Sequence, residues 1–119
     1  MELGDLLSKR CFERPKGSPT LARDEAEGML ALVPGWELAA AGGALRWKRR
    51  FRSFGEAMAF VNRVAALAEA EGHHPDIRVY SYRWVELELS THSIGGLSEN
   101  DFIMAAKTNR LVEEQLPSP

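Results

Sequence analysis

The chain carries three histidines, and their positions suggest acid–base chemistry. His73 and His74 are adjacent, between Gly72 and Pro75, and His92 lies further along the chain. Histidine titrates near neutral pH, so one ring can act as an acid while another acts as a base. Adjacent side chains diverge in a regular helix or strand, but an irregular backbone before proline can direct both toward one site. The three histidines are therefore the first candidates for a catalytic site.

Zinc binding is the main rival interpretation, because three histidines can hold a catalytic zinc ion. The common helical spacing of two histidines four residues apart is absent, and the only cysteine, Cys11, is distant in the sequence. A histidine chosen at random is most often a surface or satisfied core residue. The adjacency of the pair favours a functional site, but spacing alone does not show that the three rings converge.

A helix over residues 53–71 is expected to position the histidine pair. Ser53 and Glu56 fit a capping box at its start. Apolar residues then recur at helical spacing, and they include Phe54, Met58, Val61 and Ala65. Gly72 suits the C-terminal cap, since glycine tolerates a left-handed backbone. The helix is therefore expected to end directly before His73.

Two hairpins are expected on either side of this helix. Residues 36–52 alternate between apolar and polar, with Gly42-Gly43 as the turn. After Pro75, a short strand is expected around residues 77–79, followed by strict alternation over residues 84–92. This alternation places Thr91 on the apolar face and His92 at the strand end on the polar face.

Helices are also expected over residues 21–33 and from Ser98 onward. The order helix, two strands, helix, two strands, helix predicts an α+β fold, with a four-stranded antiparallel sheet and helices on one face. We expect residues 1–20 to form a loosely ordered arm, residues 21–114 a single domain, and residues 115–119 a frayed tail.

Composition excludes several classes of protein. The 119 residues are 45% hydrophobic and 27% charged, which argues against disorder, and the net charge of −2 gives no reason to expect a nucleic acid or membrane partner. One cysteine and no recognisable signal peptide or spanning segment indicate a cytoplasmic protein. The basic stretch "RWKRRFR" could contact single-stranded nucleic acid, but a strand with one solvated face accounts for its alternation.

Several motifs resemble those of the pterin-4a-carbinolamine dehydratase family. They are "HHPDI" and "THSIGGLSENDF", with Glu69 four residues before His73. The similarity extends back through "VPGWEL" and "ALRWKRRFRSFGEAMAFVNRVAALAE" and forward through "AAKTNRL". It covers residues 21–112, which is most of the chain.

This resemblance implies a dehydratase that works without a metal or another cofactor. The enzyme would remove water from 4a-hydroxytetrahydropterin to give quinonoid dihydropterin, in the recycling of the cofactor of aromatic amino acid hydroxylases. The family pattern places catalytic groups at His73, His74 and His92, with the first and last in the proton transfers. It places substrate-binding or ring-orienting groups at Glu69, Pro75, Thr91 and Asp101.

The resemblance also implies a homodimer or homotetramer, and it supplies the alternative function. Some members of the family act as partners that stabilise a transcription factor's dimer, so a non-catalytic binding protein is the second hypothesis. One departure from the pattern affects the fold. The stretch "IRVYSYRW" is one residue longer than usual, so a bulge is expected within residues 77–84.

Overall fold

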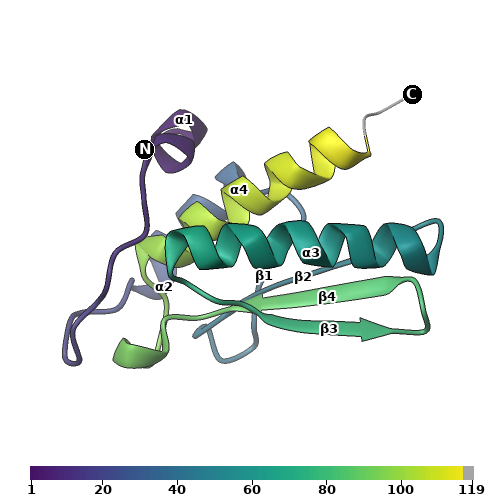
Figure 1. Ribbon diagram of the computed structural model, residues 1–119. Coiled ribbons are helices and arrows are strands. Elements are labelled where there is room, and N and C mark those ends of the chain that lie inside the picture. The colour runs from purple at the N-terminus through teal and green to yellow at the C-terminus, as the bar shows by residue number, and fades with distance from the viewer. Residues whose placement is uncertain (117–119) are drawn as a thin grey trace.

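Four antiparallel strands form one sheet in the computed structural model, which describes residues 1–116 (Figure 1). The strands are β1 (Glu37–Leu38), β2 (Leu45–Arg50), β3 (Asp76–Tyr80) and β4 (Trp84–Leu89). Their order in the sheet is β1-β2-β4-β3. The helices are α1 (Leu3–Ser8), α2 (Arg23–Met29), α3 (Phe54–Glu71) and α4 (Glu99–Gln115), with short 3-10 turns η1 (Leu30–Leu32) and η2 (His92–Ile94). The predicted α+β class is confirmed.

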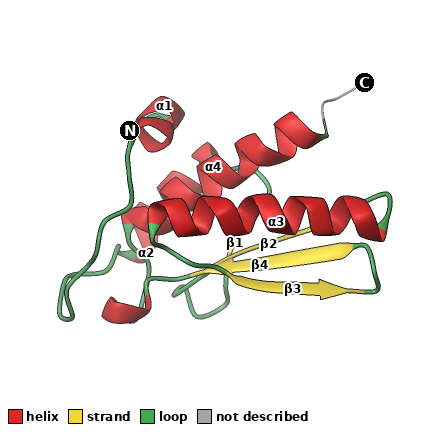
Figure 2. Ribbon diagram, in the orientation of Figure 1, coloured by secondary structure: helices red, strands yellow, loops and turns green. Residues whose placement is uncertain are grey.

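The two long helices, α3 and α4, lie together over one face of the sheet (Figure 2). The alternation in β4 explains this layer, because Val85, Leu87 and Leu89 are all buried on the helix side. The opposite face carries charged side chains that pair across the strands, such as Arg46 with Glu88 at 2.6 Å. One apolar face and one charged face therefore account for helices on a single side.

The β3–β4 hairpin contains no bulge in its paired residues. The register runs without interruption from Asp76 opposite Glu88 to Tyr80 opposite Trp84. In the turn between the two strands, Ser81 and Tyr82 adopt positive φ angles of 47° and 55°. Such angles are uncommon outside glycine.

Both ends of α3 are close to expectation. The Ser53 hydroxyl accepts a hydrogen bond from the Glu56 amide, while the Glu56 carboxylate accepts one from the Arg52 amide at 2.9 Å. The reciprocal half of the predicted capping box is thus shifted by one residue. Gly72 ends the helix with φ of 66°, as the sequence predicts. Strand β4 is shorter than predicted and ends at Leu89, so His92 begins the turn η2.

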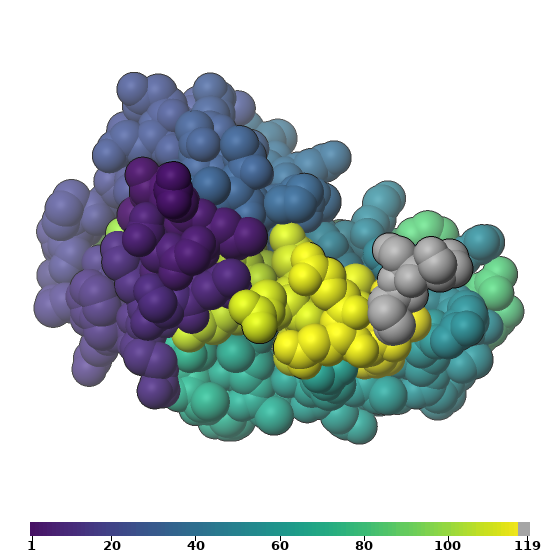
Figure 3. Space-filling view, turned by 90° about the horizontal axis from the view of Figure 1, so that it is seen from above, coloured from purple at the N-terminus to yellow at the C-terminus, as the bar shows by residue number. Residues whose placement is uncertain are grey.

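The segment before residue 21 packs on α4. Helix α1 buries Leu6 against the core, and Figure 3 shows this segment in purple beside α4 in yellow. Every residue from Asn100 to Ala106 is buried, which requires cover on more than one side of α4.

The predicted tail begins at the last residue of α4, and its residues 117–119 lie outside the described part of the chain. The domain boundaries stay predictions. Within residues 1–116, no helix is long and apolar enough to cross a membrane.

Candidate active site

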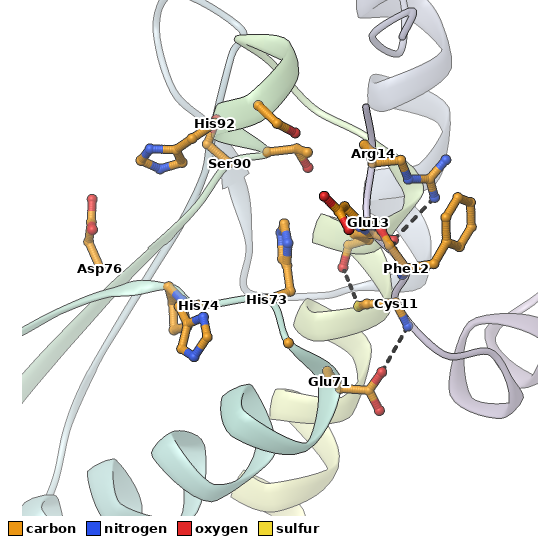
Figure 4. A pocket seen from close by; sticks show the side chains of 15 residues that line it. Cys11, Phe12, Glu13, Arg14, Glu71, His73, His74, Asp76, Ser90 and His92 are labelled. Carbon is orange, nitrogen blue, oxygen red and sulfur yellow. Dashed lines mark hydrogen bonds between the residues drawn. The ribbon is translucent and has the colours of Figure 1, made fainter. Parts of the chain in front are cut away.

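A cleft of about 690 Å³ lies where the end of α3 meets the segment after β4 (Figure 4). His73, His74 and His92 all line it. Pro75 and Thr91 also line it, so five of the seven predicted site residues share one cavity. The left-handed turn at Gly72 produces this arrangement, because it redirects the chain from α3 toward β3 directly before the histidine pair.

His73 is the most firmly held of the three histidines. Its Nε2 lies 2.7 Å from Oδ1 of Asp101, and only 11% of its side chain is exposed. The Asp101 side chain is fully buried at the start of α4. A buried carboxylate against an imidazole fixes the orientation of the ring and its tautomer.

A chain of hydrogen bonds holds Asp101 from behind. Its Oδ2 accepts hydrogen bonds from the Thr91 hydroxyl at 2.8 Å and from the Ser98 amide at 3.0 Å. The Thr91 and Ser98 hydroxyls lie 2.7 Å apart, and the Ser98 hydroxyl accepts from the Asn100 amide. Since Thr91 donates to the carboxylate, Ser98 donates to Thr91, and the whole chain points toward Asp101.

The direction of these bonds determines which nitrogen of His73 is available. Asp101 receives two hydrogen bonds on Oδ2 and acts as an acceptor, as an ionised carboxylate does. His73 therefore donates from Nε2 to Oδ1 of Asp101. Its Nδ1 is then the ring nitrogen that can exchange a proton with a molecule in the cleft.

His74 has a much more open environment. Its Nε2 lies 3.5 Å from a carboxylate oxygen of Glu69, and the two side chains are 59% and 80% exposed. Glu69 does not line the cleft. The predicted role of this glutamate is therefore supported only through its proximity to His74.

His92 reaches the cleft from the opposite wall. It begins the turn η2, whose backbone is fixed by a bridge between Thr91 and Gly96. Thr20 lies directly against Gly96, so closely that a β-carbon there would lie 2.7 Å from its methyl group. This close packing requires glycine and positions the loop that carries His92.

The N-terminal segment supplies a wall of the cleft that the sequence did not predict. Cys11, Phe12, Glu13 and Arg14 all line it. Asn100 also lines the cleft and contacts this segment through hydrogen bonds to Phe12 and Arg14. No local pattern indicated these contacts, because they join residues 86 to 88 positions apart.

Glu71 ties the same segment to α3 and α4. Its carboxylate accepts hydrogen bonds from the Cys11 amide at 2.8 Å and from Lys107 at 2.7 Å, and Arg10 lies 3.2 Å away. Burial alone would raise the pKa of Glu71, but these hydrogen bonds and charges hold it below its ordinary value. Burial and the charge of Glu71 raise the pKa of the Cys11 thiol to about 12. Cys11 is therefore a poor nucleophile near neutral pH.

Two of the three histidines face a carboxylate, His73 facing Asp101 and His74 facing Glu69. Within residues 1–116, no group of three or more His, Cys, Asp or Glu side chains is placed to hold a metal ion. The site instead offers an oriented imidazole, two further imidazoles and open volume. Such an arrangement suits proton transfer to and from a bound molecule.

Comparison with known proteins gives this geometry a family. The family model described as pterin 4 alpha carbinolamine dehydratase matches residues 19–111. A curated protein of Methylococcus capsulatus that carries this family's name is 46% identical over 114 residues, with 96% of this chain and 99% of that protein covered. Pterin-4-alpha-carbinolamine dehydratase 2 of Arabidopsis thaliana, a mitochondrial protein, is 43% identical, with 96% of this chain and 63% of that protein covered.

A solved structure agrees with the sequence comparisons. The crystal structure of a transcriptional coactivator/pterin dehydratase from Brucella melitensis superposes with a TM-score of 0.74 at 31% identity. The alignment covers 78% of this chain and 98% of that one. Fold, sequence and family model thus agree, and the chain belongs to the pterin-4-alpha-carbinolamine dehydratase family, which is named for a lyase activity.

Proposed function

We propose that the protein removes water from 4a-hydroxytetrahydropterin and gives quinonoid dihydropterin. The observation that carries this proposal is the His73–Asp101 pair at 2.7 Å, in the wall of a cleft that His74 and His92 also line. The reaction breaks the C4a–O bond and the N5–H bond and forms a C4a=N5 double bond. It therefore needs one proton donor and one proton acceptor, and no oxidant or reductant.

His73 is proposed as the base that takes the proton from N5 of the substrate. Its Nε2–H is committed to Asp101, so Nδ1 can take the proton. The resulting imidazolium lies beside the Asp101 carboxylate, which pairs with the positive charge as it forms. Asp101 itself is a positioning residue in this scheme, because it is buried behind the ring.

His92 is proposed as the proton donor for the departing hydroxyl group. It lines the same cleft as His73 but is carried by a different wall, the turn after β4. Donor and acceptor on separate elements allow a flat pterin ring to lie between them. The exposed His74 assists by contacting the substrate, together with Pro75 and Thr91 in the same cleft.

Recycling of the cofactor of aromatic amino acid hydroxylases is the proposed context of this reaction, as the family implies. The homodimer or homotetramer and the cytoplasmic location stay predictions. The oriented His73–Asp101 pair favours catalysis over the binding-protein alternative, since a scaffold does not require a buried carboxylate directed at a cleft histidine.

The test is the dehydration of freshly prepared 4a-hydroxytetrahydropterin, followed by ultraviolet absorbance. We expect the wild-type protein to accelerate this step with and without a chelator in the assay. Folded protein that gives no acceleration over buffer would contradict the proposal. Loss of acceleration on chelation, with recovery on zinc addition, would replace it with a metal-dependent mechanism.

A further inference from the structure

The N-terminal segment Lys9–Arg14, which we call the arm, contributes ordered residues to the wall of the cleft. The buried Asn100 side chain donates to the Phe12 carbonyl at 2.7 Å and accepts from the Phe12 amide at 3.3 Å. One side-chain amide thus binds both polar groups of one arm residue, as a neighbouring strand would. The main chain of the arm is fixed at the position where it meets the cleft.

A second set of contacts, the Glu71 clip, holds the arm at the end of α3. Glu71 accepts a hydrogen bond from the Cys11 amide, and Lys107, which is bound to Glu71, also donates to the Lys9 carbonyl at 2.7 Å. The Glu71 side chain is only 5% exposed. A buried ion pair that also satisfies backbone groups orders a segment more firmly than surface pairs do.

The side chains of the arm alternate in direction. The Arg14 guanidinium lies 3.7 Å from the centre of the Phe12 ring and donates to Asn100 Oδ1 at 3.1 Å. Residues two apart in an extended segment share a side, which brings these two together. Figure 4 shows both pointing away from the histidines, whereas Glu13, between them, lies on the cleft side of the arm.

Glu13 brings a free carboxylate to this cleft. Among residues 1–116, no hydrogen bond or ion pair of the structure involves its side chain, and the residue is exposed. Glu71, in contrast, is fully engaged by Cys11 and Lys107. Asp76 is a second cleft carboxylate without such a bond, but it lies near His74, on the far side of His73 from the arm (Figure 4).

We propose that Glu13 is a substrate-positioning residue that binds the donor edge of the pterin ring. This inference rests on the proposed function, because it concerns the same substrate. The pyrimidine half of a pterin carries a 2-amino group beside N3–H, and two parallel donors match the two oxygens of a carboxylate. The arm holds that carboxylate in the wall of the same cleft as His73, the residue proposed to act at N5.

The test compares a stable dihydropterin with the analogue in which oxygen replaces the 2-amino group. Wild-type protein should bind the amino compound more tightly. Glu13→Gln, which keeps the size and removes the charge, should weaken that binding about two- to ten-fold and abolish the preference. Glu113→Gln changes an exposed glutamate on α4, away from the cleft, and should change neither value.

Asp76→Asn is the critical comparison within the cleft. If Glu13→Gln prefers the amino compound as strongly as wild type does, the assignment of Glu13 is overturned and the proposed function is left intact. The same conclusion follows if only Asp76→Asn loses that preference. Wild-type protein that binds neither compound would overturn both proposals. The alkylation rate of Cys11, the only cysteine, shows whether the arm stays docked. We expect Glu13→Gln to leave the alkylation rate of Cys11 unchanged. A faster rate together with loss of the preference for the amino compound would show that the substitution releases the arm, and would overturn the direct contact of Glu13 with the substrate.

Discussion

The two adjacent histidines occupy very different surroundings. His73 is 11% exposed and faces a fully buried Asp101, whereas His74 is 59% exposed and faces a Glu69 that is 80% exposed. Both pairs join a histidine to a carboxylate, but solvent screens the second pair and permits many geometries. Only the first pair can hold a ring in one orientation and one tautomer. The difference supports the proposal that His73 transfers the proton and that His74 makes a supporting contact.

The origin of this difference lies in the supports behind each carboxylate. Asp101 lies in the first turn of α4 and is held by the Thr91 hydroxyl and the Ser98 amide. Glu69 is exposed on α3, and among residues 1–116 its side chain has one polar contact, the 3.5 Å contact with His74. The carboxylate beside His73 is therefore held by two parts of the fold, the start of α4 and the segment after β4, and the carboxylate beside His74 lies on a single helix surface.

Asp101→Asn should have the largest effect on this contrast. The amide no longer carries the charge that pairs with a protonated His73, and its nitrogen cannot accept the Thr91 hydrogen bond. We expect kcat/KM for dehydration to fall about 10²- to 10³-fold while the far-ultraviolet circular dichroism stays native. A fall of less than about three-fold in a folded variant would show that the buried pair is structural only.

Thr91→Val tests the support of the buried pair through stability. Valine keeps the shape of the side chain but removes the hydroxyl that donates to Asp101 and bonds to Ser98. Both of these hydrogen bonds are buried. Unfolding in urea should give a loss of about 1–3 kcal/mol. The control, Glu113→Gln, changes an exposed side chain on α4 and should stay within about 0.5 kcal/mol of wild type. Equal values for the two variants would contradict the hydrogen-bond chain.

A pH series tests the Glu71 clip, which holds the arm beside His73. The pKa of Glu71 is lower in the folded protein than its ordinary value of 4.5. Its stabilising effect is therefore complete above about pH 4.5 and is lost as the pH falls through the folded pKa. The unfolding free energy of wild type should exceed that of Glu71→Gln at pH 7, and the difference should shrink below pH 4.5. A constant difference across pH 3–7 would contradict the pairing.

Glu69→Gln should have the smallest effect. An exposed ion pair contributes little, so kcat/KM should change by less than about three-fold between pH 6 and 8. The assay is the same dehydration used for Asp101→Asn. A loss comparable with that of Asp101→Asn would mean that the open pair orients its ring as firmly as the buried one, which would remove the contrast.

Local sequence patterns predicted most of the framework that carries the histidines. The α3 helix and its Gly72 cap were predictable because helical spacing and a left-handed cap depend on neighbouring residues. The alternation that placed Thr91 on the apolar face also placed it beside Asp101. Strand β4 stopped early, since the Thr91–Gly96 bridge turns the chain before His92. Alternation alone contains no information about that bridge.

The arm and the second half of the hydrogen-bond chain were not predictable in the same way. The last helix was expected from Ser98 onward, but the Ser98 hydroxyl also reaches Thr91. Residues 1–20 read as a proline- and glycine-containing charged segment, and the order of the arm within them comes from Asn100 and Glu71, which lie 88 and 60 residues from their partners in it. Contacts over such separations depend on the assembled fold, so no sequence window contains them.

The most direct test of the account is a side-by-side measurement of kcat/KM for His73→Ala and His74→Ala in the dehydration of 4a-hydroxytetrahydropterin. The two substitutions remove the same side chain from adjacent positions, so only the surroundings differ. We expect a loss of about 10²- to 10⁴-fold for His73→Ala and less than about ten-fold for His74→Ala. Equal losses, or a larger loss for His74→Ala, would contradict the assignment of proton transfer to the buried pair.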